Sequence, residues 1–170
     1  MGKDFVTELP ETLFSAAQQD IVNIDENIEG KKYPLELKHN SICSRATEAA
    51  EKMLKGYIHD YDLSIDIDKR HDLKYLYEKV FEIDSKFQNI KEDLNALNNY
   101  TSRARYFRTG KIERHEVINV LKLLKNIYEF ELLNNKRIEI CSNDSQYVLP
   151  NNCLDNIVKT ISGIKNKETG

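Results

Sequence analysis

The sequence has no tryptophan, and only three prolines and six glycines stand among its 170 residues. Proline and glycine are the residues that most often interrupt a helix, so their scarcity leaves long stretches in which helices can form. Cysteine is scarce as well, with Cys43, Cys141 and Cys153 as its only instances. Their spacing fits neither a zinc ribbon nor a disulfide framework. We therefore expect free thiols and a reducing compartment.

Long apolar runs and a strong excess of one charge are also missing. No stretch approaches the ~18 apolar residues of a membrane-spanning helix, and the first residues lack the apolar segment of a signal peptide. These absences predict a cytoplasmic protein without a membrane partner. The net charge is −3, so no global basic field attracts nucleic acid, and an RNA contact would need a local basic patch.

The chain does contain stripes of apolar residues that recur every three or four positions, which is the spacing of one helical face. They predict helices over 11–29, 35–59, 73–97 and 111–135, with a break near Asp84 and Ser85 and a last short helix around 154–161. We expect an all-α, up-and-down bundle of four or five helices over 11–135. An irregular lead-in over 1–10 precedes it, and a short C-terminal helical extension over 136–170 follows.

Two segments admit another interpretation. Acidic and apolar residues alternate over 62–68 as they would in a half-buried strand, although helices are predicted on both sides. Residues 137–141 form a similar short run. On the sequence alone, both remain open between strand and loop.

Several motifs follow one another in a recognisable order. The first predicted helix carries Ala16-Ala-Gln-Gln-Asp20, and the second carries Ala50-Glu-Lys-Met-Leu-Lys55, similar to a pattern Ala-Glu-Lys-x-x-Lys. Arg70-His-Asp-Leu-Lys-Tyr-Leu76 is similar to Thr-His-Asp-Leu-x-x-Leu, and Tyr100–Tyr106 to Tyr-x-x-x-Arg-Tyr-Pro, with Phe107 in place of the proline. Together, over roughly residues 12–135, they resemble the HEPN domain family (higher eukaryotes and prokaryotes nucleotide-binding).

The resemblance implies a helical bundle that forms a homodimer and needs no cofactor. Many HEPN domains are metal-independent endoribonucleases of toxin–antitoxin or defence systems. Others are non-catalytic modules that bind nucleotides or act as partners of nucleotidyltransferases. A plain helical scaffold or interaction protein is a third hypothesis.

One pair of residues matches the signature of the ribonuclease members, which is an arginine, four to six residues, and then a histidine. Arg108 precedes His115 by six intervening residues, between the third and fourth main helices, where those members carry the motif. Histidine titrates near neutral pH and can take a proton from a 2′-hydroxyl, while an arginine fork can hold phosphate oxygens. Near a helix N-terminus, the positive end of the dipole favours the neutral base.

Two departures from the signature stand beside the match. Thr109 replaces the asparagine that often follows the arginine, and Val117 replaces the tyrosine of one toxin subgroup. The alternative is that Arg108 and His115 are ordinary loop and helix-start residues.

A local basic and aromatic cluster lies beside this pair. The resemblance singles out Arg105 and Tyr106, and Arg103 precedes them, so these three are the candidate residues for binding a nucleotide or RNA. The alternative is a solvated turn whose aromatic rings pack under the bundle.

Other polar residues have simpler explanations. Asp72 is expected to cap a helix rather than form a dyad with His71, and Glu51 and Lys55 are expected to form a surface pair one turn apart. No set of residues has metal-ligand spacing, so no metal site is expected.

Overall fold

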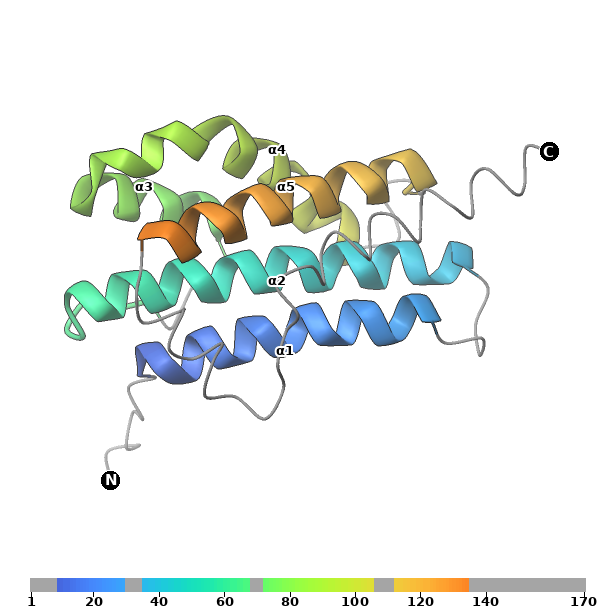
Figure 1. The fold of residues 1–170 in the computed structure, drawn as a ribbon. Helices are drawn as coiled ribbons and strands as arrows, with labels where there is room; N and C mark the ends of the chain where they lie inside the picture. Colours follow the sequence, from blue (N-terminus) through green and yellow to red (C-terminus); the bar gives the residue numbers. More distant parts are fainter. Residues whose placement is uncertain (1–8, 30–34, 68–71, 106–111, 135–170) are drawn as a thin grey trace, which may run out of the picture.

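The computed structural model describes residues 9–29, 35–67, 72–105 and 112–134, and in these ranges every regular element is a helix, with no strand. The elements are α1 (Pro10–Glu29), α2 (Leu35–Tyr61), α3 (Leu73–Ile83), the short 3-10 helix η1 (Ser85–Ile90), α4 (Lys91–Arg105) and α5 (Arg114–Asn134). Figure 1 shows them as one bundle. The predicted all-α fold is therefore confirmed.

Helix α2 lies at the centre of this bundle, because it contacts α1, α3, α4 and α5. α1 runs antiparallel to it, which brings Phe14 against Gly56 and Asp20 against Lys52. α5 runs parallel to α2 (Figure 1), since a hydrogen bond joins His39 to Ile112 near the start of both helices. α1 and α2 therefore form an antiparallel pair, as expected from the short connection between them.

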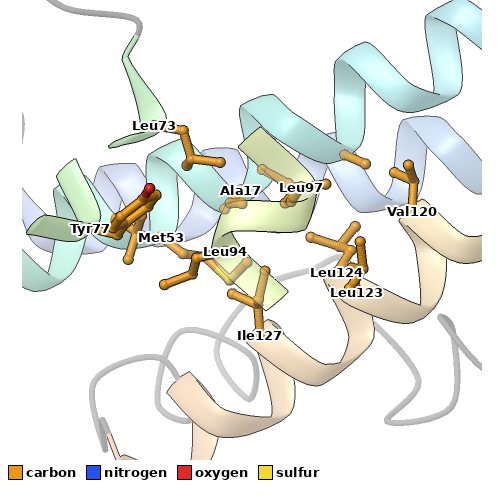
Figure 2. Packing of buried hydrophobic residues seen from close by; sticks show 14 of the residues in the cluster. Ala17, Met53, Leu73, Tyr77, Leu94, Leu97, Val120, Leu123, Leu124 and Ile127 are labelled. Atoms are coloured by element: carbon orange, nitrogen blue, oxygen red, sulfur yellow. The ribbon is translucent and has the colours of Figure 1, made fainter. Parts of the chain in front are cut away.

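The core forms where the apolar stripes of the helices meet. Ala46, Ala49 and Ala50 are fully buried, and such small side chains let neighbouring helices approach α2 closely. Figure 2 shows how Leu94 of α4 and Ile127 of α5 point toward one another beside Met53 of α2. Each stripe is therefore buried against another stripe, which is where most of the stability of such helices arises.

A break at Asp84 divides the third helical stretch, as predicted. The Asp84 carboxylate accepts from the Lys86 backbone N–H at 3.0 Å and from the Tyr57 hydroxyl at 2.8 Å. It thereby caps η1 and ties the end of α3 to α2. The backbone N–H of Lys86, followed by the Tyr57 hydroxyl, lowers the pKa of Asp84 from its ordinary value.

Residues 62–67 form turns, which decides between the loop and the strand that the sequence left open; Asp62 accepts hydrogen bonds from the backbone N–H and the hydroxyl of Ser64. Two sequence-based expectations need correction. Glu51 and Lys55 do pair, at 3.0 Å, but both are buried, so the pair does not lie on the surface. α5 begins at Arg114 rather than at 111. The expected lead-in, the helix near 154–161 and the extension over 136–170 fall almost wholly outside the described residues and stay predictions.

Candidate functional site at the start of α5

The start of α5 is held by a reciprocal cap. The backbone N–H of Glu113 donates to Oε2 of Glu116 at 2.8 Å, and the carbonyl of Glu113 accepts from the N–H groups of Glu116 and Val117 at 3.0 and 3.2 Å. This is the half of a capping box that glutamate at the third helical position supplies. The first turn of α5 is thus well defined, and the side chain of Val117 anchors it in the core.

His115 is the second residue of α5, close to the helix start as expected, and its side chain is exposed. The other described histidines differ from it. His39 is 6% exposed and His59 is 3% exposed, and each contacts a backbone carbonyl oxygen, that of Ile112 at 2.9 Å and that of Ile65 at 3.1 Å. Among the histidines of the described ranges, therefore, only His115 has an exposed imidazole.

The remaining predicted site residues lie at or beyond the end of α4. Arg103 and Arg105 belong to the last turn of α4, where only their backbone is described. Arg108 and Tyr106 lie outside the described residues. In Figure 1 the yellow end of α4 and the gold start of α5 both lie in the right half of the view. A connection of eight residues, 106–113, joins the two helix ends.

The structure adds one residue that the sequence did not single out. His39 of α2 contacts the carbonyl oxygen of Ile112, three residues before His115, although 73 positions separate the two partners. No local pattern around His39 could have identified this contact, because it depends on how α2 packs beside the segment that leads into α5.

Two further charged groups are buried elsewhere in the bundle. Asp20 of α1 is contacted by Lys52 at 2.6 Å and by Arg45 at 3.4 Å. Glu131 of α5 is fully buried, and burial raises its pKa well above the ordinary value. In the described part of the chain no group of three or more ligating side chains could hold a metal ion, and no helix there is long and apolar enough to cross a membrane.

The comparisons with known proteins agree with this architecture. The family model of the HEPN domain matches residues 10–147, a span that contains every helix described above. Neither the curated proteins nor the solved structures contain a significant match to this chain. Since the matched span covers far more than half of the sequence, the chain belongs to the HEPN domain family, a family of nucleotide-binding and ribonuclease-type proteins.

Proposed function

We propose that this protein is a cytoplasmic, metal-independent endoribonuclease of the toxin or defence type, acting as a homodimer. His115 acts as the general base, and Arg108 stabilises the charge that develops on the phosphate. Arg103, Arg105 and Tyr106 bind the RNA strand beside them.

The observation that supports this function best is the exposure of His115 on a fixed helix start. A histidine in a loop or a core has many structural explanations, but an exposed histidine in a capped first turn contributes no apolar burial. Its neighbour Val117 is 1% exposed and anchors the turn from below. A rigid element that carries an accessible imidazole is what proton transfer requires, because rates depend strongly on geometry.

The chemistry of the proposed step balances without an external oxidant or reductant. His115 takes the proton of a ribose 2′-hydroxyl, and the 2′-oxygen attacks the adjacent phosphorus. The bond from phosphorus to the 5′-oxygen breaks, and the leaving oxygen takes a proton from the protonated imidazole or from water. The products are a 2′,3′-cyclic phosphate and a 5′-hydroxyl end. The guanidinium of Arg108 would bind the phosphate oxygens as they gain negative charge.

A second candidate function is a non-catalytic module that binds a single nucleotide or partners a nucleotidyltransferase. The net charge of −3 favours it, because affinity for a long polyanion depends on positive charge spread over several phosphates. A mononucleotide needs only the local cluster of Arg103, Arg105 and Tyr106. In this case substitutions in that cluster abolish binding, whereas His115→Ala leaves it intact.

The test is cleavage of a mixed RNA pool in the presence of a metal chelator. Wild type, His115→Ala and Arg108→Ala are compared, with Lys122→Ala as the control at an exposed position of the same helix. We expect cleavage by wild type and by the control, and a loss of at least about 100-fold in the His115 variant. RNA left intact by wild type would overturn the ribonuclease proposal and favour nucleotide binding.

A further inference from the structure

The contact between His39 and Ile112 joins the central helix to the segment that carries His115. His39 lies on α2, about one turn from its start, and is 6% exposed. Its Nδ1 lies 2.9 Å from the carbonyl oxygen of Ile112. A carbonyl oxygen can only accept, so Nδ1 carries the proton and donates it. The hydrogen bond is buried, and its loss would leave a carbonyl without this donor in a place that water does not reach.

From Ile112 to His115 the chain has little freedom. The side chain of Ile112 is fully buried in the core, and its carbonyl is bound by His39. Glu113 follows and is fixed by its reciprocal bonds with Glu116. His115 then stands in the first helical turn. Two anchors on Ile112 and one cap therefore set both the position and the direction in which α5 begins.

Catalysis by a histidine base is sensitive to this kind of placement. A displacement of about 1 Å can cost about 100-fold in rate, because the base must lie within hydrogen-bond reach of the proton that it removes. The core anchors α5 through Val117, two residues after His115, and further along the helix through Leu121, Leu124 and Ile127. Just before the start of the helix, the hydrogen bond from His39 reaches across from α2 and holds the backbone of Ile112.

We propose that His39 is a positioning residue that sets the catalytic placement of His115 by holding the Ile112 carbonyl. This role rests on the ribonuclease function proposed above. His39 itself touches no substrate, since it is buried, and it acts through the backbone of Ile112 and Glu113.

The chain offers a matched control on the same helix. His59 is also buried, and its Nε2 lies 3.1 Å from the carbonyl oxygen of Ile65. That contact closes the turn after α2, at the opposite end of the helix from His39. Replacing either histidine by leucine removes its hydrogen bond to a carbonyl oxygen, which is buried at His39 and part-buried at His59, and keeps apolar bulk. The two variants should therefore lose similar amounts of stability but differ in activity.

The experiment measures kcat and KM for RNA cleavage in five forms of the full-length protein, with folding checked by circular dichroism. These are wild type, His115→Ala, His39→Leu, His39→Asn and His59→Leu. We expect kcat to fall about 10- to 100-fold in His39→Leu, with KM changed less than about threefold. His39→Asn should regain most of kcat, because its amide nitrogen stands at about the same distance from the backbone as Nδ1. His59→Leu should keep the wild-type kcat.

The outcomes separate the two proposals. An inactive wild type, or a fully active His115→Ala, overturns the ribonuclease function and the positioning role with it. If wild type is active and His115→Ala is not, the function stands. The positioning role is then overturned if folded His39→Leu keeps the wild-type kcat. It is also overturned if His59→Leu loses as much kcat as His39→Leu, or if His39→Asn has a kcat no higher than that of His39→Leu. Should His39→Leu fail to fold, the same criterion is applied to His39→Asn against His39→Ser, a shorter side chain that cannot reach the carbonyl.

Discussion

Lys52 Nζ lies 2.6 Å from Oδ2 of Asp20, across the interface between α1 and α2. The Asp20 side chain is 3% exposed, and its other oxygen lies 3.4 Å from Arg45. A buried carboxylate in a bundle is costly unless cations compensate it. The two cations of α2 therefore make it possible for an aspartate on α1 to face the interior of the bundle.

Removing the nearer cation should destabilise the fold. Lys52→Met keeps the aliphatic stem but leaves Asp20 with only the longer contact to Arg45, so we expect a loss of about 2–3 kcal/mol in the free energy of unfolding. Lys74→Met is the control, because its exposed pair with Glu78 at 3.9 Å should contribute less than about 0.5 kcal/mol. Urea denaturation measures both. Equal losses in the two variants would contradict the argument.

Gly56 lets the ring of Phe14 lie against the backbone of α2. A Cβ at this position would stand 2.5 Å from Cε1 of Phe14, which is buried. Alanine is the better helix former by about 1 kcal/mol, yet overpacking costs about 1–3 kcal/mol, so Gly56→Ala should lose about 1–2 kcal/mol. Combining it with Phe14→Leu should cost less than the sum of the two single changes. Strict additivity in denaturation experiments would rule out the steric account.

Asp84 should give the protein a specific sensitivity to acid. Its pKa is lower in the folded chain than its ordinary value near about 3.9, so the stability it contributes is present above about pH 4 and is lost as the pH falls through the folded pKa. Asp84→Asn should cost about 1 kcal/mol at pH 7 and progressively less below pH ~4. Melting temperatures measured across this pH range test it. A difference that stays constant with pH would show that the charge is irrelevant, and Glu78→Gln, at an exposed position, is the control.

Glu131 should have the opposite dependence on pH. In the described part of the chain neither of its side-chain oxygens has a hydrogen-bond partner, and burial holds its pKa well above the ordinary value. The unfolded chain releases this proton above about pH 4 while the folded chain keeps it, so stability falls as the pH rises toward the folded pKa. Glu131→Gln removes this loss.

The glutamine variant should therefore gain stability relative to wild type as the pH rises above about 5, by at most about 1.4 kcal/mol per pH unit. The matched control is Glu129→Gln on the same helix. Glu129 is exposed, and its ion pair with Lys125 at 3.7 Å should contribute little to stability at any pH. Chemical denaturation at several pH values decides the matter. If the free energy of unfolding changed with pH in the same way in Glu131→Gln and in wild type, the carboxyl of Glu131 would ionise normally in the folded state.

The sequence predicted the parts of this fold that depend on neighbouring residues. The apolar stripe of α1 and the break at Asp84 follow from spacing and capping chemistry, which are local. The pairing of Asp20 with Lys52 does not, because it depends on the register of two antiparallel helices. The expectation that Glu51 and Lys55 lie on the surface was wrong for the same reason. Their spacing shows that they can pair, but it does not show which way their face of α2 points.

The same distinction between local and long-range information applies to the candidate site. The spacing from Arg108 singled out His115, and the apolar stripe placed it near the start of a helix; in the structure it is the second residue of α5 and its side chain is exposed. The contact of His39 with Ile112 joins residues that are distant in sequence, so only the packed bundle reveals it. The roles of Arg103, Arg105, Tyr106 and Arg108 stay predictions.

The most direct test of the central claim uses a short RNA and the same oligonucleotide with a 2′-deoxy sugar at the cleavage position. If His115 removes the proton of a 2′-hydroxyl, wild type in the presence of a chelator should cut only the ribose form, and it should leave a 2′,3′-cyclic phosphate and a 5′-hydroxyl. His115→Ala should leave both oligonucleotides intact. Cleavage of the deoxy form, or products that end in a 3′-hydroxyl and a 5′-phosphate, would contradict the account.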